Sequence, residues 1–212
     1  YLAVQFLLAL ILTMCQLFPV SLLVKSLVEE KELRLKQTMK IMGLNHAVHT
    51  ASWYLSACAM FFINALISSL IATFFLPNTA YWVLLLFIGL FCLASVSFAF
   101  LLSVFFTNAI LSAVCGPVVF FAMVLPKYLF FGSNRYERVN EKLAASLLAP
   151  TAFAFGAEVL GDYEYAAVGV SPKNWTDGDY SFVLSLLALA FDAVLYFLLA
   201  LYLERTLPSR YG

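Results

Sequence analysis

Charge is the property that this sequence lacks most. Its 212 residues include only 12 basic and 12 acidic side chains, so charged residues make up 11% of the chain and hydrophobic residues 64%. An ordinary soluble domain carries about 25% charged residues. So few charges cannot coat a water-soluble globule, which excludes a soluble enzyme. The formal net charge of +0 also argues against a polyanionic partner such as nucleic acid.

Residues that could carry chemistry are also scarce. His46 and His49 lie three residues apart, but no Asp, Glu or Cys stands nearby to complete a metal site. The chain has no phosphate-binding loop and no nucleophile elbow, so we predict neither a catalytic site nor a bound cofactor within it. We interpret the cysteines as small hydrophobic residues buried in the membrane, because all four lie in apolar runs, at Cys15, Cys58, Cys92 and Cys115.

Long hydrophobic runs are what the sequence has instead. Residues 41–126 include no Asp, Glu, Lys or Arg. A helix needs about 20 apolar residues to cross the ~30 Å hydrocarbon core, so this stretch holds three spans. Lipid offers no partners for backbone groups, so the spans must be helices rather than strands. The pattern predicts an all-α, polytopic membrane bundle, a single transmembrane domain over 1–212 with five spans at about 1–24, 49–75, 81–106, 109–131 and 181–203.

One apolar segment, from Leu143 to Val159, is too short to be a span. Pro150 and Gly156 interrupt it, and Pro150 would divide it into two half-length helices. We therefore predict an outer re-entrant helical hairpin at about residues 140–160. A sixth span is the alternative.

Positive charge sets the expected topology. Five Lys or Arg residues fall within 25–40, and the positive side of a membrane protein faces the cytosol. Five spans then place residues 132–180 outside, where Asn174 begins a glycosylation motif, Asn174-Trp175-Thr176. The membrane itself is either the plasma membrane or that of an organelle. Because Tyr1 already lies inside an apolar run, without a signal peptide, we expect the chain to be a piece of a longer protein.

The pattern of residues 25–43 predicts a cytosolic amphipathic helix that ends at Gly43. Its apolar stripe is formed by Val28, Leu35, Met39 and Met42. Acid-before-base pairs at four-residue spacing are expected to stabilise it, namely Glu30 with Arg34 and Glu32 with Lys36. The mixed charges favour a helix that couples to a cytosolic domain, and its candidate coupling residues are Glu29, Glu30, Lys31, Glu32, Arg34, Lys36, Lys40 and Gly43. A helix that rests on the bilayer surface is the alternative.

Asp192 stands out as a charge near the middle of the last span. A carboxylate at that depth costs about 2.5–3.5 kcal/mol on insertion scales, so it should face protein or water. Its candidate partners, chosen by residue type, are Asn64, Ser68, Ser69 and Thr73. The alternative is a role in a substrate path or a conformational switch. Ser95, Ala99 and Ser103 recur every four residues and predict a close helix contact.

The segment 29–44, EEKELRLKQTMKIMGL, resembles the intracellular helix of the first transmembrane domain in the A subfamily of ATP-binding cassette transporters. Three further blocks agree in order and spacing: residues 113–116 (AVCG), residues 146–156 (SLLAPTAFAFG), and the last helix with Phe191-Asp192, Leu195-Tyr196 and its exit through Pro208 to Gly212. The second block is similar to the family's outer helical hairpin. Pro117 and Lys127 depart from the family pattern.

The resemblance implies a function that composition alone does not. These transporters export or flip lipids, and this chain would supply helices two to six of the first half. Its partners would be the bilayer, a lipid substrate, a nucleotide-binding domain and the second transmembrane half. ATP and Mg²⁺ would bind in the nucleotide-binding domains, outside this chain, which has no Walker motif. The alternatives are a transporter of the same type for a non-lipid substrate and a membrane scaffold that transports nothing.

Overall fold

The computed structural model describes residues 2–41, 43, 46–130, 138–172, 174–178 and 180–206, without the side chains of 2–9, 36, 37, 40, 46 and 47. Every element in these ranges is helical. In chain order they are α1 (Leu2–Glu32), α2 (Leu35–Ile41), α3 (His46–Phe75), α4 (Tyr81–Phe105), α5 (Ala109–Ala122), the 3-10 helix η1 (Leu125–Phe130), α6 (Val139–Ala145), α7 (Ala149–Tyr165) and α8 (Phe182–Thr206).

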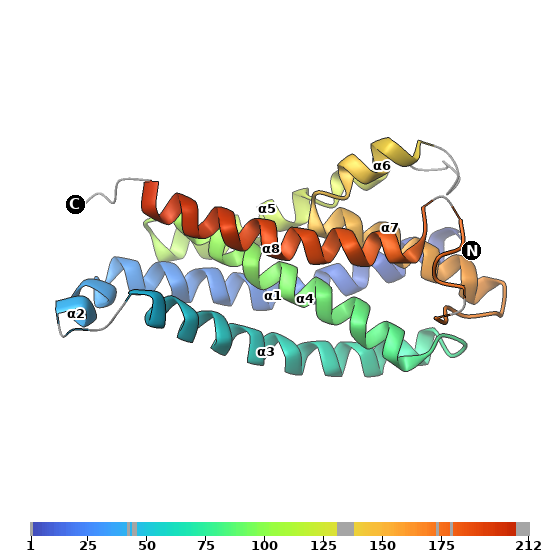
Figure 1. The fold of residues 1–212 in the computed structure, drawn as a ribbon, viewed down its shortest axis with the longest axis horizontal. Helices are drawn as coiled ribbons and strands as arrows, with labels where there is room; N and C mark the ends of the chain where they lie inside the picture. Colours follow the sequence, from blue (N-terminus) through green and yellow to red (C-terminus); the bar gives the residue numbers. More distant parts are fainter. Residues whose placement is uncertain are drawn as a thin grey trace.

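Five segments of the described chain are long and apolar enough to cross a membrane, which confirms the expected number of spans. They are Leu10–Glu32, Val48–Phe75, Tyr81–Phe105, Ala109–Phe130 and Phe182–Thr206. The helices run back and forth along one long axis (Figure 1). We call the end where α2 and the last turn of α8 lie the α2 end. The opposite end, where α6 and the last turn of α7 lie, is the hairpin end.

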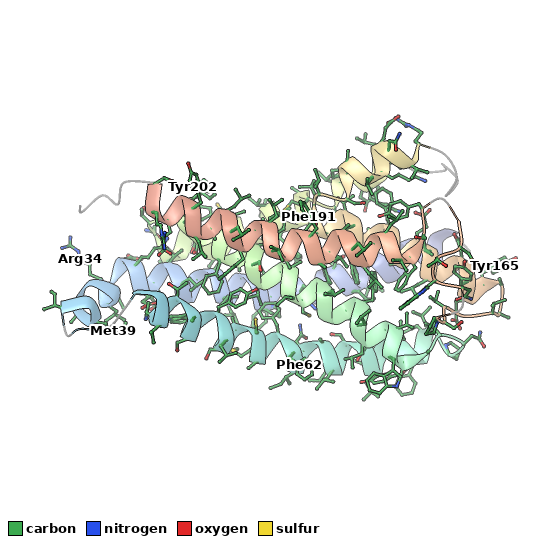
Figure 2. All side chains as sticks on the ribbon, in the orientation of Figure 1. Arg34, Met39, Phe62, Tyr165, Phe191 and Tyr202 are labelled. Atoms are coloured by element: carbon green, nitrogen blue, oxygen red, sulfur yellow. The ribbon has the colours of Figure 1, made fainter. Side chains whose placement is uncertain are left out.

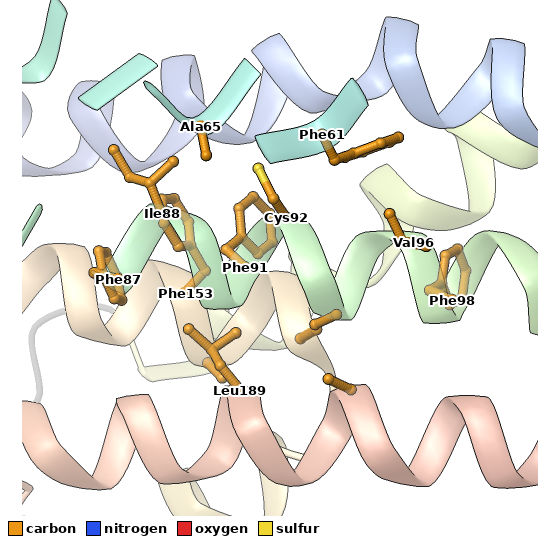
Figure 3. Close-up of a cluster of buried hydrophobic side chains, with 14 of the residues drawn as sticks. Phe61, Ala65, Phe87, Ile88, Phe91, Cys92, Val96, Phe98, Phe153 and Leu189 are labelled. Atoms are coloured by element: carbon orange, nitrogen blue, oxygen red, sulfur yellow. The ribbon is translucent and has the colours of Figure 1, made fainter. Parts of the chain in front are cut away.

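Helix α4 forms the centre of the bundle and packs against α8, α3 and α1. Ser95, Ala99 and Ser103 are all buried, which confirms the close contact expected of this small-residue face. Toward the hairpin end, aromatic rings fill the interface between α4 and α7 (Figure 3). Phe153 stacks on Phe87 and Phe91 with ring centroids 4.6 and 4.0 Å apart. Since lipid is as apolar as these rings, their close packing rather than a hydrophobic driving force holds the helices together.

The predicted hairpin segment contains two helices, but the break lies earlier than expected. Helix α6 ends at Ala145, and the turn 146–148 precedes α7, in which Pro150 occupies the first turn. Proline is favoured there because the first N–H groups of a helix have no partner within the helix. Pro150 therefore begins a helix rather than interrupting one. Both α6 and α7 reach their outer ends at the hairpin end of the bundle (Figure 1).

The segment 25–43 differs more from the expectation. The sequence predicts one separate helix, whereas α1 continues through Lys25 to Glu32 and a turn at Leu33 and Arg34 leads into α2. Arg34 has a φ of 55°, which no helical residue adopts. The residues from Lys25 to Glu32 are mostly good helix formers, so nothing local ends α1 sooner.

Candidate functional site

The last turn of α1 contacts three different helices through three consecutive charged residues. Glu30 is buried, and its Oε1 lies 2.6 Å from Nε2 of His49 in α3. The Nζ of Lys31 donates to the backbone oxygen of Ser103 in α4 at 2.6 Å. The Oε2 of Glu32 accepts from the backbone N–H of Ala109, the first residue of α5, at 3.0 Å. We call these three side chains the α1 anchor.

Two of these contacts match the charge of the helix end that they touch. Ser103 lies in the last turn of α4, where the carbonyl oxygens lack helical partners and carry partial negative charge, so the Lys31 cation is favourable. Ala109 lies at the start of α5, where unpaired N–H groups favour an anion. The Oδ1 of Asn108 accepts from Ile110 and Leu111 in the same turn, so Glu32 and Asn108 together satisfy the start of α5.

The ion pairs expected from the sequence, Glu30 with Arg34 and Glu32 with Lys36, assume one continuous helix. In the structure α1 ends at Glu32 and Arg34 has a left-handed backbone conformation. The four-residue rule holds only within an unbroken helix. Lys36 and Lys40 belong to α2, yet their side chains lie outside the described residues, as do Met42 and the segment 208–212. Glu29, next to Glu30 on α1, is exposed.

A small pocket lies beside the anchor. It is lined by Glu30, Lys31 and His49 together with Ser103 and Glu204 of α8, and its volume is about 50 Å³. One water molecule needs a cavity volume of about 10–15 Å³, so the pocket has room for a few waters but not for a lipid. The pocket brings the end of α8 to the same place as the ends of α1 and α4.

Helix α2 leaves apolar side chains uncovered beyond the α2 end. Leu33, Leu35 and Ile41 are 62%, 46% and 87% exposed. Figure 2 places Arg34 and Met39 on this projecting part of the chain. Val28, which the sequence assigns to the same stripe, is instead buried within the bundle. Gly43 has a φ of 91°, a conformation that commonly follows the last turn of a helix. Among the described residues α2 packs mainly on α1, which leaves its remaining surface available.

A chain of polar side chains crosses the middle of the bundle. Asn64 of α3 donates through Nδ2 to Oε1 of Gln16 in α1 at 2.9 Å, and Nε2 of Gln16 donates to Sγ of Cys92 in α4 at 3.3 Å. Gln16 is buried and was missed by the sequence analysis, although a glutamine inside an apolar span is itself a signal. Ser68 is buried on α3, and the Ser69 hydroxyl bonds within α3 to the oxygen of Leu66.

Asp192 does not meet the partners that residue type suggested. It is buried on α8, which packs on α4 and α7, whereas Asn64 and Ser68 lie on α3. Neither carboxyl oxygen has a hydrogen-bond partner among the described residues.

Replacing Asp192 with valine is expected to raise stability. An unsatisfied buried polar group costs about 1–3 kcal/mol, and valine has no polar atom to leave unpaired. The melting temperature of the purified full-length protein should therefore increase. A clear decrease would contradict this reading and would show that the carboxyl group has a partner outside this chain.

The turn between α6 and α7 depends on one hydroxyl group of α8. The Oη of Tyr196 donates to the backbone oxygen of Leu147 at 2.8 Å and accepts from the N–H of Ala149 at 3.2 Å. Ser146 hydrogen-bonds to the hydroxyl of Tyr180 at 2.8 Å. Burial raises the pKa of the Tyr180 hydroxyl, which stays protonated and able to donate.

Lys127 of η1 forms an ion pair with Glu158 of α7. This pair links the two helices and explains how a lysine is tolerated in η1.

Replacing Tyr196 with phenylalanine is expected to destabilise the protein by about 1–3 kcal/mol, because the buried N–H of Ala149 and the partly buried backbone oxygen of Leu147 lose their partner at once. The ring packing remains, so the loss reports on the hydroxyl alone. Tyr202→Phe is the matched control, since Tyr202 is exposed on the same helix. Equal melting temperatures for the two variants would contradict this role of Tyr196.

At the hairpin end, the carboxylate of Glu164 joins α7 to the turn between α3 and α4. Its Oε1 accepts from the backbone N–H and Nδ2 of Asn78 at 2.8 and 2.9 Å, and its Oε2 accepts from Oγ1 of Thr79 at 2.9 Å. The side chain of Asn174 stabilises the loop that follows α7. Its Nδ2 donates to the backbone oxygen of Gly169 at 2.9 Å, and its Oδ1 accepts from the N–H of Ser171 at 2.7 Å.

Comparison with known proteins assigns this helical bundle to a family. The family model described as "ABC-2 family transporter protein" matches residues 2–202. ATP-binding cassette sub-family A member 7 of Mus musculus is 39% identical over 211 residues, which cover 97% of this chain and 10% of that protein. The retinal-specific phospholipid-transporting ATPase ABCA4 of Bos taurus is 37% identical over 206 residues, or 92% of this chain and 9% of that protein. Phospholipid-transporting ATPase ABCA7 of Homo sapiens is 38% identical over 211 residues, or 97% and 10%. The chain thus spans about a tenth of the length of these relatives.

Proposed function

The chain belongs to the ABC-2 family of transporter proteins, and from that membership we propose that it is part of one membrane half of an ATP-driven phospholipid transporter. The cargo follows from two of the relatives, whose names describe them as phospholipid-transporting ATPases. ATP and Mg²⁺ would bind in nucleotide-binding domains outside this chain, and a second membrane half would complete the pathway.

We propose that α2 couples ATP-driven motion to the spans. Exposed Leu33, Leu35 and Ile41 form an apolar surface at the end of the bundle, of the kind that a partner domain covers. A displacement of α2 is transmitted to α1 through the short turn at Arg34. The α1 anchor then passes the motion to α3, α4 and α5, because packed helices shift as units rather than deform. The anchor is the observation that carries this proposal.

The proposed orientation places the α2 end in the cytosol. Lys25 and Lys31 near the end of α1, Arg205 in the last turn of α8 and Arg34 (Figure 2) lie at that end, and the positive side of a membrane protein is cytosolic. Asn174 then lies outside the cell or in the lumen and can accept a glycan.

We further propose that α6 and α7 form a re-entrant hairpin, which enters from the outer side and returns to it. Non-helical backbone at membrane depth needs partners supplied by the protein. The hydroxyl of Tyr196 supplies two such partners at the turn between α6 and α7, which supports a turn within the hydrocarbon region.

Cysteine labelling of the full-length protein tests the orientation and the number of spans together. In a background without reactive cysteines, Thr176→Cys should react with a membrane-impermeant maleimide from outside, and Thr38→Cys only after the membrane is opened. Both positions are exposed, so access alone decides the result. Labelling of residue 176 only from the cytosol would overturn the five-span topology.

Reconstitution tests the transport activity. The full-length protein in liposomes should move a fluorescent phospholipid between leaflets only when ATP and Mg²⁺ are present. An ATPase that is active but moves a polar solute instead would refute the lipid cargo. ATP hydrolysis without movement of either would favour a scaffold.

A further inference from the structure

A deep apolar groove runs between α3 and α4 on the outward side of the bundle. Its volume is about 650 Å³, and its lining consists only of residues of these two helices, without a charged side chain. Leu55 and Phe62 form the α3 wall, and Trp82 and Leu86 form the α4 wall. Phe62 lies on the outer side of α3 in Figure 2. None of the groove's lining residues belongs to the α1 anchor or contacts it, so the groove takes no part in the proposed coupling.

Gly89 leaves open space in the α4 wall of the groove. A Cβ atom added at Gly89 would meet no atom within 4 Å, whereas one added at Gly156 would meet the ring of Phe87 at 2.5 Å. Gly89 lies inside α4, where glycine costs about 1 kcal/mol relative to alanine. Neither close packing nor a turn requires glycine here, so what it provides is open space.

The groove is long enough to cross one leaflet of a bilayer. It extends along α4 from Trp82 to Val96, which corresponds to about 21 Å at 1.5 Å per residue. Half of the hydrocarbon core is about 15 Å thick. Trp82 is the second residue of α4 at the hairpin end, and tryptophan favours the level of the lipid headgroups.

The side chains at the rim of the groove favour a lipid chain over a protein helix. Helix contacts in membranes use small or hydrogen-bonding residues at their surface. The rim here carries large, exposed side chains: Leu55 is 73%, Phe62 56% and Trp82 78% exposed. Small-molecule pockets measure about 300–1,000 Å³, a range that includes this groove.

We propose that the groove between α3 and α4 is a binding site for one acyl chain of a phospholipid. The headgroup lies at the level of Trp82, in the leaflet at the hairpin end, and the chain runs past Gly89 toward Val96. The site faces the bilayer laterally and is independent of the transport cycle, so it holds whether or not the transporter moves phospholipid.

Photocrosslinking in nanodiscs tests this proposal. The full-length protein is reconstituted with phosphatidylcholine that carries a diazirine in the middle of one acyl chain, and the adducts are mapped by mass spectrometry. We expect adducts to concentrate on the groove residues of α3 and α4. Gly89→Leu fills the hollow and should lower the adduct yield there about tenfold. Gly89→Ala should lower it only slightly.

Two further variants complete the experiment. Ala59→Phe fills the groove from the α3 wall and should have the same effect, which keeps the test valid if Gly89→Leu does not fold. Val118→Phe adds bulk at an exposed position of α5 and should leave the yield unchanged.

Three results would overturn the proposal. One is an equal adduct yield at exposed residues outside the groove, such as Phe74 and Leu129, which would indicate ordinary bilayer contact. Another is an unchanged yield in both filled variants. The third is the absence of lipid adducts from the groove residues of the unmodified protein.

Discussion

Replacing Glu32 with lysine in the full-length protein should lower ATP-dependent lipid movement about tenfold or more, while ATP binding persists. Glu32 accepts from the N–H of Ala109, and such a charge-assisted hydrogen bond contributes about 1.5–3 kcal/mol. A loss of that size changes a conformational equilibrium about tenfold to a hundredfold. Lysine also places a cation at the start of α5, where the helix dipole is unfavourable to it. Lipid movement and nucleotide binding are measured on the same reconstituted samples.

Two matched variants separate this effect from a general change of charge. Glu29→Lys makes the same change at an exposed position of α1 and should transport normally. Glu32→Gln keeps an oxygen that can accept from Ala109 and should retain most of the activity. If Glu29→Lys were as impaired as Glu32→Lys, net charge at the α2 end and not the anchor would explain the loss.

Glu30 behaves differently from a surface charge in this structure. The sequence suggests that reversing Glu30 and Glu32 would leave folding nearly intact, since exposed ion pairs contribute only about 0–1 kcal/mol. Glu30 is instead buried against His49. Glu30→Lys would bring two basic groups together in a confined place, so it should reduce stability as well as transport.

Replacing Gly169 with alanine should destabilise the protein by about 3 kcal/mol or more, enough to prevent folding of a marginally stable bundle. Gly169 has a φ of 67°, which costs an alanine about 1–2 kcal/mol. Its Cβ would also lie 2.0 Å from the backbone oxygen of Asn78, in a turn that Glu164 holds in place. Backbone cannot move aside as a side chain can.

Gly89→Ala is the control, because the added Cβ meets no atom and α4 gains helix propensity. Thermal unfolding of the two variants, measured on detergent-purified full-length protein, should differ strongly. A Gly169→Ala variant as stable as Gly89→Ala would contradict the close contact between the 166–170 loop and the turn at Asn78.

The spans could be predicted because hydropathy is a local property. Each span needs only a long apolar run, and the uncharged stretch 41–126 supplies three of them. The break at Arg34 could not be predicted in the same way. Arginine has no preference for a positive φ, and the residues around it favour a helix, so tertiary contacts of the α1 anchor decide where α1 ends.

The partners of the charged residues were the least predictable part of the site. Glu32 bonds to Ala109, a residue far along the chain, through a backbone N–H that any sequence possesses. No pattern of side chains marks such a contact. For the same reason, residue type could not tell that Asn64 meets Gln16 rather than Asp192. Which faces of α3 and α8 meet α4 depends on the packing of the entire bundle.

The α1 anchor is proposed above all to transmit nucleotide-driven motion to the spans. The most direct test is the distance between spin labels at Leu111 of α5 and Phe74 of α3, both exposed, in the full-length protein with and without trapped ATP. We predict a nucleotide-dependent shift that persists in Glu29→Lys and disappears in Glu32→Lys. The same shift in Glu32→Lys, or none in the unmodified protein, would contradict the claim.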